Sequence, residues 1–418
     1  DYQSSQGQAL ETIAGFRKRV VLPEESDVFG IFNFSHKDGD KIVTKVLIHS
    51  GSKLYLWKNY PNTANIVLSE TIVVPEPDSV VNGTKTFKQI LPENVVTVTA
   101  LARTNGEDLT FLMNYDAATR ELSYASSDLV AGDRLLLSYK EGILTAADAL
   151  FDNMNPRKST SFIFNNRLYI IDGKNYLVYD GVSVKSVLDN AYIPLTYINI
   201  ITSGENADIG KQHEQRNILQ SKFRHTFIAD GTTTEFFLNE NALDEIVSVK
   251  VYGQAKVQGT DFTVSLANGS IKFIVALEKP ERVVQIAGAT ESENVFYPEM
   301  YAGIEVVAKK VFTSVSGVTD ECAEISRLIT DCTIATIYDN RVFLSGNPNY
   351  PNHIFYAARN STGYVDPSYF GILNYMQDGV GVAPITGMIT VADTLMVLKD
   401  DTQQDGSTYF HTPTQTND

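Results

Sequence analysis

A short phrase, a turn followed by an apolar strand, occurs four times and constrains the fold more than any other feature of this chain. Each copy begins with the second residue of a polar or small turn pair, continues with a cation or threonine, and ends in an apolar run. Each copy also follows a β-rich run, so the phrase is typical of the second strand of a hairpin. The copies lie at residues 52–57, 166–171, 340–345 and 393–398, and the preceding runs at 43–48, 161–164, 333–338 and 385–391.

The spacing of the four copies predicts a β-propeller. They start at residues 52, 166, 340 and 393. With two foreign segments of roughly 60 and 125 residues removed, every interval is about 50 residues, the length of one four-stranded blade. We therefore predict an all-β fold with a propeller core, which is either minimal or incomplete because no closing strand is evident. The alternative is coincidence, since strand–turn–strand phrases are common in all-β proteins.

The two foreign segments share one order of parts. Each opens on a turn, at Gly83 in the first and at Gly231 in the second, and continues with alternating apolar and polar runs. Such alternation is typical of half-buried antiparallel strands, so we predict two inserted β-sandwiches of similar build. The last predicted strand of the second lies at residues 282–286. The predicted propeller parts are residues 1–69, 141–193 and 321–418, and the predicted sandwiches are residues 70–140 and 194–320.

Composition favours sheets and excludes some partners. Tyr and Phe number 21 each, and both are frequent in strands. Asp and Glu outnumber Lys and Arg by 50 to 34, and the resulting net charge of −16 excludes nucleic-acid binding through a general basic surface. There is no apolar run long enough for a transmembrane helix and no secretory leader at the start, so we expect no membrane insertion.

Cysteine and histidine usage predicts neither a disulfide framework nor a metal site. Cys322 and Cys332 are too few for a scaffold and lack CxxC spacing, so we predict reduced, buried thiols. The six histidines have no metal-ligand spacing, and no metal or cofactor is expected. Helical segments are predicted only around residues 142–153 and 321–328.

Catalytic motifs are missing from the sequence, so we predict no catalytic residue and no enzyme activity. Propellers can host glycosidase sites built from carboxylates, and by position the candidates are Asp172, Asp180 and Asp339. All three sit in turn phrases, where Asp serves as a local acceptor for backbone N–H groups. The turn function is therefore the favoured interpretation.

An unusual loop, residues 346–352, carries two prolines and three asparagines between strands. Asn347, Asn349 and the following His353 could form a polar site. A rigid, self-capped loop is the structural alternative, and we favour it because Pro and Asn both restrict turn geometry.

The phrase at residues 338–352 resembles one found in bacteriophage virion proteins with a propeller core, known as tail nozzle, tail tubular, muzzle or stabilization proteins. Residues 366–370 and 395–400 resemble further parts of that family, as do residues 14–17 and 192–194. The inserts look like the β-sandwich modules of phage virion proteins. The resemblance covers most of the chain, although the family's later strands have no counterpart here.

The resemblance implies a structural role in the virion, as a ring in the tail or neck. It implies assembly in the host cytoplasm and a homo-oligomer, with six copies typical of nozzle-like relatives. The implied partners are the portal or adaptor and other tail and fibre proteins, with genome DNA passing through without sequence-specific binding. The acidic balance suits such a conduit, since a negative wall repels phosphates.

Two rivals come from other functional classes. One is a receptor- or glycan-binding tail protein, with Trp57 and Tyr356 stacking on sugars. Trp57 ends an apolar strand, however, and is predicted to be a core residue of a blade. The other rival is a propeller enzyme that cleaves glycans.

Overall fold

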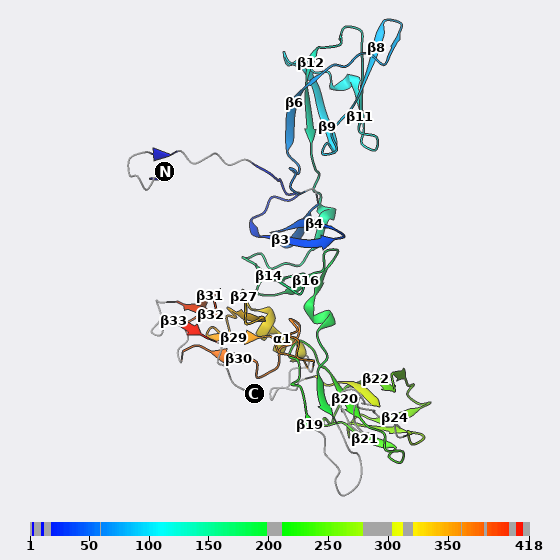
Figure 1. Ribbon diagram of the computed structural model, residues 1–418, viewed down its shortest axis with the longest axis vertical. Coiled ribbons are helices and arrows are strands. Elements are labelled where there is room, and N and C mark those ends of the chain that lie inside the picture. Colours follow the sequence, from blue (N-terminus) through cyan, green and yellow to red (C-terminus); the bar gives the residue numbers. More distant parts are fainter. Residues whose placement is uncertain are drawn as a thin grey trace, which may run out of the picture. The chain divides into compact units, whose positions relative to one another are not determined.

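The structure is a computed structural model of the 418-residue protein. It describes residues 2–3, 10–11, 18–58, 60–198, 211–278, 303–311, 321–360, 362–379, 383–400 and 407–412. Contacts divide the chain into two compact units, Asp1–Pro156 and Arg157–Asp418, and each is described by itself. Regular structure in the described residues is almost entirely β, and most strand pairs are antiparallel (Figure 1), which confirms the predicted all-β class.

All four repeated phrases form the second strand of an antiparallel hairpin, as predicted. In two of them the turn pair, Asn165–Asn166 or Asp339–Asn340, takes positive φ angles between 46° and 57°. Two successive left-handed residues make the turn whose twist matches the flanking strands, and Asn and Asp tolerate that conformation. The hairpins are β4 (Lys41–Ser50) with β5 (Lys53–Trp57), β14 (Thr160–Phe164) with β15 (Arg167–Ile171), β27 (Ile334–Tyr338) with β28 (Arg341–Ser345), and β31 (Ile385–Val391) with β32 (Thr394–Lys399).

The first unit contains a four-stranded sheet in the order β13-β5-β4-β3, with β3 at Val28–Asp38 and β13 at Ala149–Phe151. Its core includes Ile48, Tyr55 and Trp57, which agrees with the predicted core position of Trp57. β5 and β13 are paired neighbours although an inserted segment separates them in sequence. The parent sheet is therefore continuous across the insertion point.

The inserted segment of the first unit has two sheets (Figure 1). The two sheets share one hydrophobic core. Phe87, Leu122 and Tyr124 enter the core from one sheet, and Leu135 and Leu137 enter it from the other. The sheets are β6-β12-β9 (Val67–Val73, Arg134–Lys140, Thr97–Arg103) and β10-β11-β8-β7 (Met113–Asp116, Glu121–Ser126, Thr84–Ile90, Ser79–Val81).

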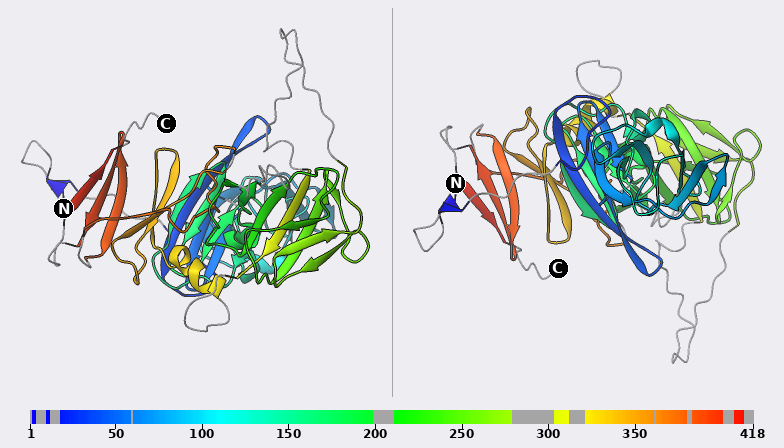
Figure 2. Two further views of the ribbon diagram at one scale, coloured as in Figure 1. Left: turned by 90° about the horizontal axis from the view of Figure 1, so that it is seen from below. Right: turned by 90° about the horizontal axis from the view of Figure 1, so that it is seen from above.

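The second unit contains three hairpin-based sheets, in which the middle one buries both of its faces. On β28, Val342 and Leu344 enter the core shared with the 160–186 sheet, and Phe343 enters the core shared with the 385–411 sheet. The middle and last sheets lie side by side in both views of Figure 2, in orange and red. The sheets are β14-β15-β16-β17 (β16 Tyr176–Tyr179, β17 Val184–Ser186), β27-β28-β29-β30 (β29 His353–Tyr356, β30 Tyr375–Gln377) and β31-β32-β33 (β33 Thr408–His411).

A second inserted segment, in the second unit, repeats the strand order of the first. The order β6-β12-β9 corresponds to β20-β26-β22, and β10-β11-β8 corresponds to β24-β25-β21. The two sheets of this segment also share one core. The predicted strand at residues 282–286 lies outside the described residues. The sheets are β19-β18-β20-β26-β22-β23 (Lys211–Gln212, Leu195–Ile198, Lys222–Phe227, Ile304–Lys309, Glu245–Val251, Gln254–Ala255) and β21-β25-β24 (Glu235–Phe237, Ser270–Phe273, Phe262–Ser265).

In both inserted segments, the set of strands that the two share begins and ends on one rung of a β-ladder; in the second segment, β18 and β19 precede this rung in sequence. Val67 at the start of β6 pairs with Lys140 at the end of β12. Lys222 at the start of β20 pairs with Lys309 at the end of β26. Each insert therefore enters and leaves through adjacent antiparallel strands.

Helices are few, and one helical prediction is wrong. The predicted helix near residues 321–328 is present as α1 (Glu321–Thr330). Residues 142–153 do not form an α-helix: they form a 3₁₀ turn (Ala146–Asp148), capped by a hydrogen bond from Thr145 N to Asp148, followed by β13. The end of this segment, β13, pairs with β5 and completes the parent sheet. This pairing outweighs the helix propensity of the segment, as tertiary contacts often do. Within the described residues, no helix has the length and apolar character needed to cross a bilayer.

Candidate functional site

The best candidate site is a cavity of about 360 Å³ beside the 160–186 sheet, within the second unit. Its volume falls at the lower end of the range of small-molecule sites. Most of its lining side chains are polar or charged. They are Arg167, Tyr169, Val178, Asp180, Lys185, Ser186, Val187, Asn190, Asp366 and Ser368.

Strand register brings one wall of the cavity together. Tyr169 on β15 pairs with Val178 on β16, and Val178 pairs with Lys185 on β17. Arg167 is the first residue of β15, two positions before Tyr169, and Asp180 directly follows β16, two positions after Val178, so the period of a strand places both on the same side of the sheet. On the same face of the sheet, Ile171 and Tyr176 are buried in the core shared with β28.

A second wall is the turn at residues 366–368, which contributes Asp366 and Ser368 to the lining and is fixed by several hydrogen bonds. Ser368 donates its hydroxyl hydrogen to Asp366 Oδ1 at 2.7 Å and accepts the backbone N–H of Tyr192 at 3.0 Å. Asn217 donates from Nδ2 to the Ser368 carbonyl oxygen at 2.7 Å. The buried hydroxyl of Tyr176, on β16, donates to the Pro367 carbonyl oxygen at 2.8 Å. The wall is thus pinned to the sheet and to the loop before β20.

The electrostatics of the cavity are balanced. Arg167 and Lys185 contribute two positive charges, and Asp180 and Asp366 contribute two negative charges. Partial burial acts to raise the pKa of Asp180, but N–H groups of Ser183 and Val182 and the charge of Lys185 hold that pKa below its ordinary value. The Asp180 carboxyl is therefore ionised at neutral pH.

Tyr169 forms part of the floor of the cavity. Burial raises the pKa of its phenol; the nearby carboxylate of Asp366 adds to this rise and Arg167 opposes it. Its ring stacks on Phe162 with centroids 5.1 Å apart. The phenol is consequently neutral at physiological pH and is held in place from within the core.

The three carboxylates considered from sequence are not brought together. Asp180 alone lines the cavity. Asp172 is fully buried, and its Oδ1 accepts the backbone N–H groups of Lys174 and Asn175 at 3.0 and 2.7 Å. Asp339 occupies the left-handed turn between β27 and β28. Asp172 thus has the acceptor role that the sequence favoured, and so does Asp180, whose Oδ1 accepts the N–H groups of Val182 and Ser183 at 2.9 and 2.8 Å.

The asparagine-rich loop caps the helix α1. Asn347 is buried and donates from Nδ2 to the carbonyl oxygens of Arg327 and Leu328 at 2.9 and 3.1 Å. Its Oδ1 accepts the N–H of Asn349. Both carbonyls lie in the last turn of the helix, where carbonyl oxygens lack donors from within the helix; the Arg327 oxygen also accepts the N–H of Asp331, just beyond it.

A second cavity, of about 380 Å³, lies beside this loop. Asn347 and Asn349 line it together with Tyr350 and residues of α1. His353 is not among its lining residues; it bonds to Asn352 and stacks on Tyr375. Asn347, Asn349 and His353, which the sequence offered as an alternative polar site, are therefore divided between the loop and β29.

Trp57 and Tyr356, considered as sugar-stacking residues, do not line either of these cavities. Trp57 belongs to the core of the first sheet, and Tyr356 packs against the core between the middle and last sheets. Cys332 is a buried free thiol whose pKa is raised by burial. The side chain of Cys322 lies outside the described residues. Among the described residues, no group of three or more His, Cys, Asp or Glu side chains is placed to hold a metal ion.

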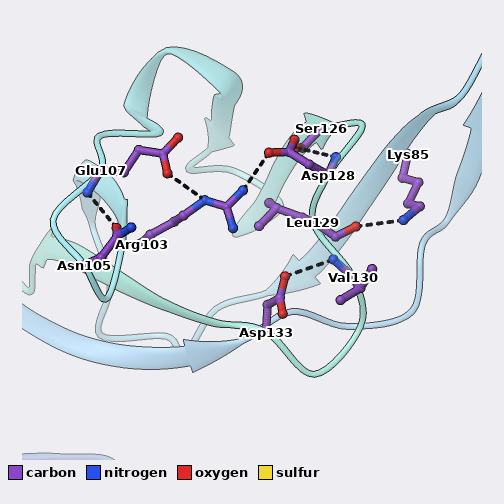
Figure 3. Close-up of polar contacts among 9 residues, drawn as sticks. All are labelled: Lys85, Arg103, Asn105, Glu107, Ser126, Asp128, Leu129, Val130 and Asp133. Carbon is purple, nitrogen blue, oxygen red and sulfur yellow. Dashed lines mark hydrogen bonds and ion pairs between the residues drawn. The ribbon is translucent and has the colours of Figure 1, made fainter.

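The first inserted segment has a polar network at one end of its sheets (Figure 3). Arg103 bridges Glu107 and Asp128 at 3.0 and 2.8 Å, and Lys85 donates to the Leu129 carbonyl oxygen at 2.9 Å. Ser126 donates its hydroxyl hydrogen to Asp128 at 2.6 Å. The network ties together loops from different strands and has a structural role.

Sequence reasoning found Asp180 but missed its neighbours in the cavity. Arg167 and Lys185 are strand residues in ordinary patterns, and Asp366 and Ser368 lie 180 or more residues farther along the chain. Only the fold places them together. The available signal was the conspicuous Asp-Pro-Ser turn at residues 366–368.

Comparison with known proteins adds no family. No protein-family model matches the chain, and a search of curated proteins returns no relative.

Proposed function

We propose that this protein is a structural, ring-forming component of a bacteriophage tail or neck, similar to nozzle and muzzle proteins. In this proposal it lines or closes the DNA exit channel, anchors neighbouring tail proteins, and has no enzyme activity. The support is the resemblance of residues 338–352 to that family, combined with the repeated hairpin sheets.

The observation that carries the proposal is the middle sheet of the second unit, which buries a core on each face. In a propeller, each internal blade packs between two neighbours in this way. We propose that the hairpin-based sheets are blades of one propeller core, and that the two inserted segments are β-sandwiches.

The inserted segments suit contacts with other virion proteins. Each has its own core and joins its parent through one pair of adjacent strands. A segment attached in this way can bind a neighbouring subunit or fibre without disturbing the blades. The net charge of −16 fits a channel whose wall repels the phosphates of passing DNA.

Light scattering after size exclusion, followed by electron microscopy of the same fraction, tests this role. We expect a homo-oligomer with rotational symmetry, in the first instance a hexamer, formed alone or on addition of the portal or adaptor. A monomer in both conditions contradicts the ring. A ring whose lumen is lined by Lys and Arg contradicts the conduit interpretation while leaving the ring intact.

The second candidate, a receptor- or glycan-binding tail protein, is favoured by one observation: the polar cavity beside the 160–186 sheet.

A further inference from the structure

We propose that the cavity beside the 160–186 sheet binds a neutral sugar ring through pairs of adjacent hydroxyl groups. This inference concerns a ligand site and does not depend on the proposed role in a tail ring. The charge balance of the cavity, its available hydrogen-bonding groups, its rigid wall and its size support this ligand.

The balanced charges of the cavity lining disfavour the binding of a charged ligand. Arg167 and Lys185 offset Asp180 and Asp366, so the cavity presents no net charge to a ligand. An anion or cation entering it would gain attraction from one pair and repulsion from the other at close range. A hydroxyl group, in contrast, is both donor and acceptor and can use both kinds of wall residue.

Hydrogen-bonding capacity remains open on both sides of the cavity. Arg167 spends part of its donor capacity on a hydrogen bond to the Tyr169 phenol, and its remaining N–H groups can serve a ligand. In the part of the chain that the structure describes, neither Arg167 nor Lys185 forms an ion pair within 4.0 Å. Asp366 binds Ser368 through Oδ1, with the backbone N–H at 2.8 Å and the hydroxyl at 2.7 Å. Both of these bonds leave Oδ2 of Asp366 without a hydrogen bond to the described residues, so it can accept from a ligand. One sugar hydroxyl can therefore donate to Asp366 while an adjacent one accepts from a cation.

The wall that carries these groups is already ordered. Ser368 is held between Asp366, the Tyr192 N–H and Asn217, and the carbonyl oxygen of Pro367 is occupied by Tyr176. A preformed wall lowers the entropic cost of binding, which matters for a small polar ligand with few contacts.

Size and floor agree with a single sugar ring. About 360 Å³ is room for a small ligand but not for a folded peptide segment. Val178 and Tyr169 supply apolar surface at the floor for the C–H face of a sugar. Tyr169 is only 6% exposed, so it offers an edge and not a stacking platform.

Methyl glycosides of glucose, galactose, mannose and N-acetylglucosamine are the probes for the full-length protein. Saturation-transfer NMR detects binding, and titration gives the dissociation constant. Glucuronate and glucosamine are the charged comparisons. We expect at least one neutral glycoside to bind with a dissociation constant on the order of 1 mM, and the charged sugars to bind less tightly.

Two exposed side chains allow a clean test by mutation. We expect Arg167→Gln and Lys185→Gln each to weaken binding about tenfold, because each removes a charge-assisted donor. Lys158→Gln is the matched control, since Lys158 is an exposed lysine just before β14 that does not line the cavity. It should bind like the unmodified protein, and all three variants should keep its melting temperature.

Three results would each overturn the proposal. The first is no detectable binding of any neutral glycoside. The second is charged sugars binding as tightly as neutral ones. The third is an unchanged dissociation constant in the double variant Arg167→Gln, Lys185→Gln, which would place the bound sugar elsewhere. None of these results bears on whether the protein forms a ring.

Discussion

Tyr176 donates its buried hydroxyl hydrogen to the carbonyl oxygen of Pro367 at 2.8 Å, across 191 positions of sequence. The same ring lies near Phe162, Tyr169 and Phe370 in the core between the first two sheets of the second unit. One side chain on β16 thus fixes both the packing of that core and the turn that forms a wall of the candidate site.

Tyr176→Phe should lower the free energy of unfolding by about 1–3 kcal/mol, because it leaves the buried Pro367 carbonyl oxygen without its donor. Chemical denaturation measures this. Tyr364→Phe is the control: Tyr364 is 75% exposed near the same turn and its change should have little effect. Equal stability of Tyr176→Phe and the unmodified protein would show that the bond contributes nothing.

Gly269→Ala should destabilise the protein by about 2–4 kcal/mol, at the upper end of single substitutions. Gly269 has φ +65°, and a Cβ there would lie 1.9 Å from the carbonyl oxygen of Glu240, so the backbone must move. Gly253→Ala is the matched control, with φ +80° and nothing within 4 Å of its Cβ position. It should cost only about 1–2 kcal/mol for the left-handed backbone. If both variants melt alike, close approach to Glu240 is irrelevant.

His225→Phe should make stability less sensitive to acid. His225 is fully buried, its ring stacks on Phe227 with centroids 4.3 Å apart, and burial lowers its pKa to about 3. The unfolded chain has an ordinary histidine pKa near 6.5 and so binds more protons below that pH. Stability from the neutral ring is fully present above about pH 6.5 and is lost progressively as pH falls towards 3.

The difference in unfolding free energy between this variant and the unmodified protein should change by about 2 kcal/mol from pH 7 to pH 5. Urea unfolding at several pH values measures it. His36→Phe serves as the control for losing a histidine outside this core. Parallel pH profiles for His225→Phe and the unmodified protein would mean that His225 does not titrate as its burial requires.

A fragment of residues 66–141 should fold alone. Its sheets enclose their own core, and its ends meet on the rung between Val67 and Lys140. We expect a cooperative thermal transition in circular dichroism and dispersed amide signals in NMR. Leu122→Ala, which empties a buried position, is the comparison and should lower stability by about 2–5 kcal/mol. A fragment without a cooperative transition would show that the segment needs the rest of the chain.

Local turn chemistry was readable from sequence, whereas long-range placement was not. Asn166 and Asp339 made two hairpin turns predictable, because Asn and Asp are among the few residues that tolerate the left-handed conformation of such turns. Asp172 and Asp180 follow equivalent strands in similar turns, yet only Asp180 borders the cavity. The difference is that the turn at Asp366 lies beside Asp180 and completes the cavity there. Packing across the core sets the position of that turn, and no repeating sequence pattern predicts it.

The sequence also predicted that the two inserted segments share one order of parts, and the matching strand orders agree with this. It did not predict which residue type occupies each left-handed turn position. Leu91 N bonds to the Arg120 carbonyl oxygen, and Leu238 N bonds to that of Gly269, so the two left-handed residues are equivalent. Arginine occupies one and glycine the other, because only Gly269 closely approaches a neighbouring backbone. Such crowding depends on a partner strand and cannot be read from the residue itself.

The rungs Val67–Lys140 and Lys222–Lys309 have a practical consequence. A module whose two ends lie one strand spacing apart, about 5 Å, leaves its host strands where they would be without it. Each rung is therefore a position at which one module can be replaced by another. Any compact module with paired terminal strands could be exchanged there, so the chain can change what it contacts while keeping the sheets that hold it together.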